Sequence, residues 1–178
     1  MIELNRITDK QDSRLDQIID LYVAAFPQEE RRDLNQLRLL IEKADTMYLN
    51  AIEANDTLCG FFIYWDMGGF YYLEHLAVFP EMRNMKIGQQ VLDYIAAHLD
   101  GTRILEVEPT TDEMTTRRVN YYSRNGYHIV DKNYMQPSYR PGEEDFPLWI
   151  MSNNTTDDLS AQIEQIKDKV YRGNYTLL

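Results

Sequence analysis

The chain has 178 residues, of which 44% are hydrophobic and 12% aromatic, which fits one globular domain with a buried core and excludes a disordered chain. Its net charge of −11 argues against general binding to nucleic acids or anionic membranes, because both require a basic face; it is compatible with cationic partners such as amines, although solubility alone also explains it. Cys59 is the only cysteine, so no disulfide forms within the chain and a reducing cytoplasm is the expected compartment.

The first quarter of the chain predicts one strand and two helices. Residues 1–7 alternate between apolar and polar and predict a strand, without the apolar core of a signal sequence. Ser13 is expected to cap a helix that Pro27 ends, residues 28–32 to form a solvated connector, and Asp33 to cap a second helix. The apolar positions of the two helices are Leu15, Ile18, Ile19, Tyr22, Val23 and Phe26, followed by Leu34, Leu37, Leu40 and Ile41.

Three strands follow on short turns. They are expected at residues 47–54, 58–65 and 70–79, with turns marked by Asn55-Asp56 and by Gly68-Gly69. Consecutive strands on turns this short form an antiparallel meander. No apolar run here or elsewhere is long enough to span a bilayer.

The second half alternates helices and strands. The strand expected at residues 103–108 follows a helix that itself follows a strand, so it is expected to run parallel to strand 70–79. A later helix lies within residues 111–125, and Gly126 stands where a glycine ends helices. The remaining expected elements are a helix with the apolar positions Ile87, Val91, Ile95 and Leu99, closed by Gly101; a strand at 127–130; a polar loop at 134–146; and a strand at 148–151.

Residues 152–178 predict a C-terminal helical extension. Thr155 or Thr156 is expected to cap its helix, which ends near Gly173. Its single apolar stripe has to be buried on the parent domain, which we favour, or on a second copy of the chain, so the protein is expected to be a monomer or a homodimer. The stripe consists of Leu159, Ile163, Ile166 and Val170.

The stretch after strand 70–79 combines a proline, a basic turn and the start of a helix. Unpaired N–H groups and the helix dipole make such a turn suitable for binding phosphate. Its sequence, Leu76-Ala77-Val78-Phe79-Pro80-Glu81-Met82-Arg83-Asn84-Met85-Lys86-Ile87-Gly88, resembles the acyl-CoA signature of the GNAT superfamily of N-acyltransferases. Arg83 and Gly88 match the ends of that signature, whereas Lys86 stands where a glycine is usual. A lysine with helical φ and ψ angles is expected to alter the site but not to abolish it.

The resemblance implies an α/β (α+β) fold, in which helices flank a mixed, mostly antiparallel sheet. Residues 1–151 would form the GNAT domain and residues 152–178 the helical extension. The implied activity is that of a cytoplasmic N-acetyltransferase, which transfers an acetyl group from acetyl-CoA to a small-molecule or peptide amine by direct attack in a ternary complex. No metal is expected, because the three histidines and one cysteine lack metal-ligand spacing.

In this family the strand that corresponds to residues 70–79 splays from the one that corresponds to residues 103–108. The opened edge can pair with the amides of pantetheine like an added strand, here through the backbones of Leu76 and Val78. The basic turn would surround the diphosphate. The residues that the resemblance implies for the coenzyme are Leu76, Ala77, Val78, Arg83, Asn84, Met85, Lys86, Ile87, Gly88 and Gln89.

A second resemblance concerns the leaving group. Val119-Asn120-Tyr121-Tyr122-Ser123-Arg124-Asn125-Gly126-Tyr127 resembles a tyrosine pair that precedes a glycine and an aromatic residue in the family. On that alignment Tyr122 donates a proton to the departing thiolate, since a tyrosine of ordinary pKa, about 10, is protonated at neutral pH. A packing role for Tyr122 stays open, and Tyr121 is expected in the core.

The acceptor side offers several carboxylates. Alternation along strand 70–79 predicts that Glu74 shares a face with Leu76 and Val78 and that His75 points to the other face, where it is expected to be a structural histidine. Glu74 is therefore a candidate general base or a ligand of the amine, and Glu106 and Glu108 are its rivals in both roles.

The loop that carries Tyr139 and Arg140 either covers the acceptor site, as the resemblance implies, or is a solvated turn. An alternative to the enzyme is a catalytically silent module that binds acyl-CoA on the same fold. The departure at Lys86 keeps that alternative open.

Overall fold

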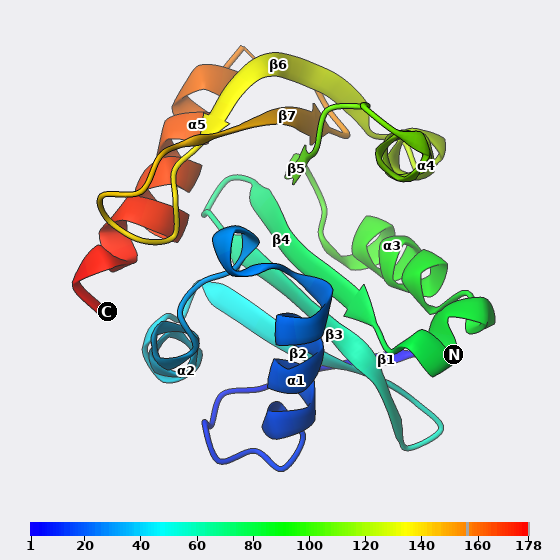
Figure 1. Ribbon diagram of the computed structural model, residues 1–178. Coiled ribbons are helices and arrows are strands. Elements are labelled where there is room, and N and C mark those ends of the chain that lie inside the picture. Colours follow the sequence, from blue (N-terminus) through cyan, green and yellow to red (C-terminus); the bar gives the residue numbers. More distant parts are fainter. Residues whose placement is uncertain (156, 178) are drawn as a thin grey trace.

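The computed structural model describes residues 1–155 and 157–177, and its elements follow the predicted order (Figure 1). A short 3-10 turn, Gln28–Glu30, separates the first two helices, and another, Pro80–Met85, precedes the third. The chain ends in a π-helical turn, Lys167–Tyr171, and a 3-10 stretch, Arg172–Leu177. The main elements are β1 (Glu3–Arg6), α1 (Leu15–Ala25), α2 (Leu34–Lys43), β2 (Met47–Ala54), β3 (Thr57–Asp66), β4 (Tyr71–Val78), α3 (Ile87–His98), β5 (Arg103–Val107), α4 (Glu113–Arg124), β6 (His128–Gln136), β7 (Phe146–Ser152) and α5 (Leu159–Ile166).

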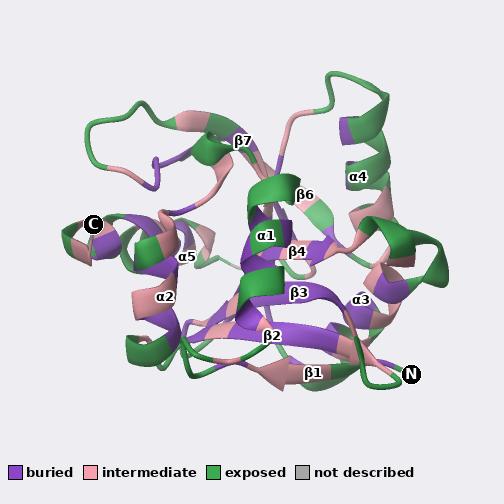
Figure 2. Cartoon of the chain, turned by 60° about the horizontal axis from the view of Figure 1, so that its bottom comes forward, coloured by how far each residue is buried: buried purple, intermediate pink, exposed green. Residues whose placement is uncertain are grey.

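The strands form one seven-stranded sheet in the order β1-β2-β3-β4-β5-β7-β6. Every neighbouring pair is antiparallel except β4 and β5, which are parallel as predicted. Helices α1, α2 and α5 pack on one face of the sheet, and α3 and α4 on the other. Most residues of β2 and β3 are buried, whereas the outer faces of α1 and α4 are exposed (Figure 2).

The sheet is open between β4 and β5. The two strands pair only over Tyr71–Leu73 and Arg103–Leu105. Beyond Leu73 they diverge, so the second half of β4 has lost its neighbour on this side (Figure 1). The predicted splay is therefore confirmed, and it leaves backbone groups of β4 free to bind a ligand.

Local sequence signals explain most element boundaries. Asn55 and Asp56 form the β2–β3 turn with positive φ angles of 49° and 60°, a conformation in which asparagine and aspartate are favoured. Asp33 accepts hydrogen bonds from the first turn of α2 and is its N-cap, as predicted. Arg14, not Ser13, is the N-cap of α1, so the prediction for Ser13 is wrong.

The prediction that Thr155 caps the C-terminal helix is also wrong. The helix α5 begins at Leu159, and Asp158 is its N-cap. The other predicted cap, Thr156, lies outside the described residues.

Two segments that were expected to be loops differ in the structure from the prediction. Strand β6 continues to Gln136, whereas the sequence predicted a strand at 127–130 and a polar loop from residue 134. Its register with β7 shifts twice, which disrupts the apolar alternation, and as an edge strand it tolerates polar residues such as the exposed Lys132. The connector 28–32 is not wholly solvated either, because Arg32 is fully buried.

The C-terminal helix packs on the parent domain, as favoured from the sequence. Ile163, Ile166 and Val170 are buried in the core that α1 and α2 share with the sheet. The Gln36 side chain of α2 donates to the Asn174 carbonyl over 2.8 Å and fixes the end of the chain to α2. No described helix has both the length and the apolar character that are needed to span a bilayer.

Candidate active site

The open edge of β4 presents backbone N–H groups in a defined direction. Successive N–H groups of a strand point to opposite edges. The Tyr71 N–H points to the β5 side and the Phe79 N–H points to β3, although the two are an even number of residues apart. A one-residue bulge must therefore lie between them, and the register places it at Glu74. It turns the N–H groups of Leu76 and Val78 toward the edge that β5 has left.

The same bulge changes which side chains share a face. Leu76 and Val78 pack with α3, whereas Glu74 and His75 both lie on the α1 side of the sheet. The predicted arrangement, with Glu74 beside Leu76 and Val78 and with His75 opposite, is wrong. Strict alternation fails at a bulge, which nothing in the sequence marks.

A pocket of about 440 Å³, here called the α3 pocket, lies between the open edge and the start of α3. Lys86 precedes the helix in the left-handed conformation, at φ 54° and ψ 28°, and not with the helical angles expected for a lysine. The position therefore favours glycine, which explains the usual glycine of the signature. The lining residues are Leu76, Val78, Arg83, Lys86, Gly88, Gln89, Arg118, Tyr121 and Tyr122.

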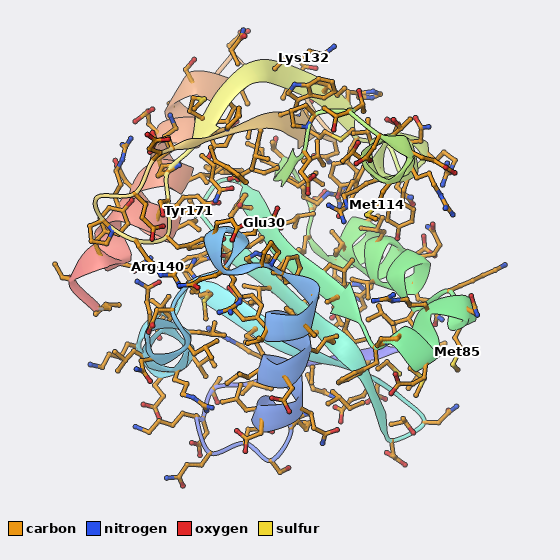
Figure 3. The ribbon with its side chains drawn as sticks, viewed as in Figure 1. Glu30, Met85, Met114, Lys132, Arg140 and Tyr171 are labelled. Carbon is orange, nitrogen blue, oxygen red and sulfur yellow. The ribbon has the colours of Figure 1, made fainter. Side chains whose placement is uncertain are left out.

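Four of the residues predicted for this region do not line the α3 pocket. Ile87 is buried in the core, and the Ala77 side chain packs on the opposite face of the sheet. Asn84 and Met85 are exposed on the turn before α3, where Figure 3 shows Met85. Their predicted coenzyme contacts stay predictions.

Tyr122 lies where two cavities meet. It lines the α3 pocket and also a cavity of about 30 Å³ within the β4–β5 opening, here called the splay cavity. Burial raises the pKa of its hydroxyl above 10, and no described residue hydrogen-bonds that hydroxyl. The group is therefore a protonated donor without a competing acceptor. Tyr121, expected in the core, also lines the α3 pocket.

Glu74 is locked in a buried network. Its side chain and that of Arg32 are both 0% exposed and form an ion pair at 2.6 Å. Trp65 Nε1 donates to Oε2 over 2.6 Å, and the Tyr139 hydroxyl donates to Oε1 over 2.9 Å. Burial raises the pKa of Glu74, but the Arg32 charge, the neighbouring His75 and the hydrogen bonds from Trp65 and Arg32 together outweigh burial. The pKa of Glu74 is therefore below its ordinary value. A carboxylate held in this way is poorly suited to accept a proton.

A third cavity, here called the aromatic pocket, has a volume of about 90 Å³ and lies on the α1 side of the splay cavity. Its wall combines aromatic side chains from distant parts of the chain with carboxylates. Figure 3 shows Glu30 and Tyr171, from opposite ends of the sequence, both directed to this region. The principal lining residues are Phe26, Tyr72, Tyr139, Phe146 and Tyr171, with Glu30, Glu106 and Glu108.

Glu106 of β5 lines both the splay cavity and the aromatic pocket. Its Oε1 accepts hydrogen bonds from Tyr72 over 2.9 Å, from Tyr134 over 3.0 Å and from Tyr171 over 2.9 Å. Burial raises its pKa to about 7, although the three hydroxyls act in the opposite direction. This carboxyl group is therefore close to half ionised at neutral pH.

The rim of the aromatic pocket is acidic. Glu108 is partly exposed and pairs with Arg118 of α4 at 3.4 Å. Burial, and then the nearby Glu108, raise the pKa of Glu30. A cation bound between these carboxylates would relieve their repulsion.

The loop between β6 and β7 closes one side of the aromatic pocket. Tyr139 is 2% exposed and lines the pocket, and Arg140 donates to the carbonyls of Gln28 and Arg31 over 3.0 and 3.3 Å. The loop is therefore attached to the turn between α1 and α2 and is not a solvated turn.

Sequence reasoning missed three residues of this region. Arg32 carries no signal, because it sits in a charged run that reads as solvated. The sequence predicts Tyr134 in a loop, and Tyr171 lies in an extension without a recognisable motif. Among the described residues, no group of histidine, cysteine and acidic side chains is arranged to hold a metal ion.

Three solved structures show the class to which this fold and its open edge belong. A protein of Bacteroides thetaiotaomicron that is assigned to the acetyltransferases of the GNAT family has a TM-score of 0.89 and 32% identity, over 95% of this chain and 98% of that chain. The ribosomal-protein-S18-alanine N-acetyltransferase of Escherichia coli has a TM-score of 0.59 and 16% identity, over 85% and 92%. Naa50 of Arabidopsis thaliana, in complex with the bisubstrate analogue CoA-Ac-MVNAL, has a TM-score of 0.57 and 19% identity, over 86% and 99%. The fold is that of acetyltransferases.

The sequence comparison specifies the family. The model of the Acetyltransferase (GNAT) family matches residues 15–127, and this chain belongs to that family. No curated protein gives a significant match.

Proposed function

We propose that this protein is an N-acetyltransferase, which transfers the acetyl group of acetyl-CoA to a primary amine of a small molecule or a peptide. The observation that carries the proposal is a row of three neighbouring cavities at the opened sheet, in which each cavity shares lining residues with the next. The α3 pocket lies at one end, the splay cavity in the middle, and the acidic aromatic pocket at the other end. Both substrates can therefore be bound at once, and the amine attacks directly in a ternary complex.

The α3 pocket fits coenzyme A. Arg83 and Lys86 supply cations, and the first N–H groups of α3 supply donors, for a diphosphate. The outward N–H groups of Leu76 and Val78 fit the amides of pantetheine. Acetyl-CoA, when bound, supplies an activated acetyl group at the splay cavity.

Tyr122 is the proposed general acid. It lies at the junction of the α3 pocket and the splay cavity, and its raised pKa keeps its hydroxyl protonated at neutral pH. From this position the hydroxyl can donate its proton to the sulfur as the thiol leaves.

The aromatic pocket is the proposed site of the amine. Its carboxylates attract an ammonium group, and the rings of Phe26, Tyr72 and Tyr139 provide faces on which a cation is stabilised. A volume of about 90 Å³ admits a slim alkyl arm. An acceptor amine at the end of an unbranched chain fits this shape best.

The test is a panel of primary amines assayed with acetyl-CoA for release of free thiol. We expect the variant Tyr122→Phe to lose roughly 10²–10⁴-fold in kcat with nearly unchanged binding of CoA, which calorimetry measures. Tyr127→Phe is the control, because Tyr127 is buried and lines none of the three cavities. An unchanged kcat in Tyr122→Phe would refute the assigned role.

The alternative is a silent module that binds acyl-CoA without turnover. The strained Lys86 favours it, because glycine allows the closest approach of phosphate at this position. Binding of CoA without thiol release from any amine would support this alternative.

A further inference from the structure

Glu106 differs from Glu74 in how its two carboxylate oxygens are used. Three tyrosine hydroxyls surround Oε1, whereas Oε2 is contacted among the described residues only by Tyr171, at 3.1 Å. Each hydroxyl carries a single hydrogen, and the Tyr171 oxygen lies closer to Oε1, at 2.9 Å. The Tyr171 hydroxyl also lies 2.9 Å from that of Tyr72. Because Oε2 has two lone pairs and at most this one donor among the described residues, at least one lone pair stays free for a ligand.

We infer that Glu106 takes the proton of the acceptor amine and that the C-terminal segment, residues 167–177, is part of the active site because its Tyr171 positions this carboxylate. The inference rests on the proposed function, since the amine has to occupy the aromatic pocket. It assigns the role of general base to Glu106 on β5 and not to Glu74 on β4.

The two alternatives on β4, Glu74 and His75, are weak bases because the pKa of each is lowered. Both oxygens of Glu74 are occupied by donors, and its pKa is lowered. Nε2 of His75 donates to the Glu30 carbonyl over 2.9 Å, which leaves Nδ1 without a hydrogen-bond partner among the described residues. Burial lowers the pKa of His75 below its ordinary value, however, so its imidazole is a weak base. Glu106, with a pKa of about 7, is matched to a reaction at neutral pH.

The proton balance is complete with the two substrates already named. Oε2 of Glu106 takes one proton from the ammonium and later releases it to solvent. The neutral amine then forms the C–N bond as the C–S bond breaks. The sulfur receives the proton of Tyr122, and the second proton lost by the nitrogen restores Tyr122 through solvent. One ammonium and one thioester give one amide, one thiol and one proton.

The position of Tyr171 is fixed by contacts on both sides. Before it, the Val170 carbonyl accepts from Arg32 over 3.1 Å. After it, the Asn174 carbonyl accepts from Gln36 over 2.8 Å, and the Tyr175 hydroxyl donates to the Ser138 carbonyl over 2.6 Å. The segment thus links α2 to the loop that closes the pocket, and it lies beyond the matched residues 15–127.

Other ionisable groups also influence Glu106. The charge of Glu74 on β4 raises the pKa of Glu106. A test of the tyrosine hydroxyls therefore has to leave the charged groups around Glu106 unchanged. The groups that surround it are Tyr72, Glu74 and His75 from β4, Glu108 after β5, Tyr134 from β6, Tyr139 from the loop, Tyr171 from the C-terminal segment, Glu30 from the first 3-10 turn and Arg118 from α4.

The experiment compares pH profiles of kcat/KM in the full-length protein. The acid limb of the wild type is expected near pH 7. In Tyr171→Phe the loss of a hydroxyl that stabilises the carboxylate moves this limb up by about 0.5–1 pH unit. Tyr134→Phe removes a second donor and shifts the limb in the same direction, which guards against a folding defect in the first variant. Tyr127→Phe, which removes the hydroxyl of a buried tyrosine that lines none of the three cavities, leaves the limb in place.

Two further measurements separate this inference from the proposed function. Glu106→Gln is expected to lose roughly 10²–10⁴-fold in kcat and to lose the acid limb, with unchanged CoA binding. Carbon NMR titration of the Glu106 carboxyl, without substrates, should show the same displacement in Tyr171→Phe as the kinetics. An active wild type whose acid limb persists in Glu106→Gln overturns this inference alone. A wild type that acetylates no amine overturns the proposed function, and the proton acceptor falls with it.

Discussion

Replacing Glu74 by glutamine tests whether this residue is structural or catalytic. The change removes the negative charge beside Arg32, whose side chain is 0% exposed and pairs with Glu74 at 2.6 Å. It also leaves one carbonyl oxygen for three donors, from Arg32, Trp65 and Tyr139. Breaking a buried ion pair from one side costs about 3–5 kcal/mol, because the remaining charge stays buried without a partner. For a chain of this length that corresponds to a decrease in Tm of about 6–20 °C.

The assay is thermal and urea unfolding of Glu74→Gln beside Glu108→Gln. Glu108 also pairs with an arginine, but at 3.4 Å and with side chains that are 40% and 48% exposed, so its loss is expected to cost less than about 1 kcal/mol. Because the folded-state pKa of Glu74 is lowered, its contribution is present above pH 4.5 and is lost as the pH falls through that lowered value. A Glu74→Gln variant that melts like the wild type but loses roughly 10²–10⁴-fold in kcat would refute this reasoning and restore Glu74 as the base.

Three further outcomes are expected. Lys86→Gly should raise the free energy of unfolding by up to about 1 kcal/mol in urea titrations, because glycine removes the cost of a φ of 54°. Gly60→Ala should lower it by about 1–3 kcal/mol, since the new Cβ would lie 2.1 Å from the Ala77 carbonyl oxygen, whereas Gly69→Ala meets no atom within 4 Å and should be nearly neutral. Because the pKa of Glu106 is raised, the folded state binds more protons than the unfolded state between pH 4.5 and about 7, so the free energy of unfolding of the wild type should fall as the pH rises through this range. Glu106→Gln should flatten that pH dependence in urea titrations at several pH values. An unchanged pH dependence would contradict the assigned pKa.

Much of the site could be read from local patterns. The proline after strand 70–79, Arg83 and Gly88 marked the α3 turn, and the resemblance of residues 119–127 to a family signature marked Tyr122, which does line two of the cavities. These signals are readable because a helix start and a helix end require particular residues within a few positions. Lys86 was recognised as a departure, but its left-handed conformation was not, because φ follows from how the turn joins two packed elements.

The acceptor side was predicted less well, for a physical reason. A single bulge at Glu74 reversed the alternation on which its assignment rested, and the buried partner of Glu74, Arg32, comes from a segment that reads as solvated. Likewise the hydroxyls around Glu106 come from three elements that are distant in sequence.

The sequence by itself determined the order of the elements, the parallel placement of β5 and the phosphate-binding turn, because each depends on periodicity or on neighbouring residues. Only the tertiary structure decided the protonation of the carboxylates. The Glu74 side chain is fully buried and Glu106 is half-buried, and what distinguishes them is a buried guanidinium beside the first and neutral hydroxyls around the second. The electrostatic environment of a buried charge is set by groups brought together through folding, so no pattern along the chain records it.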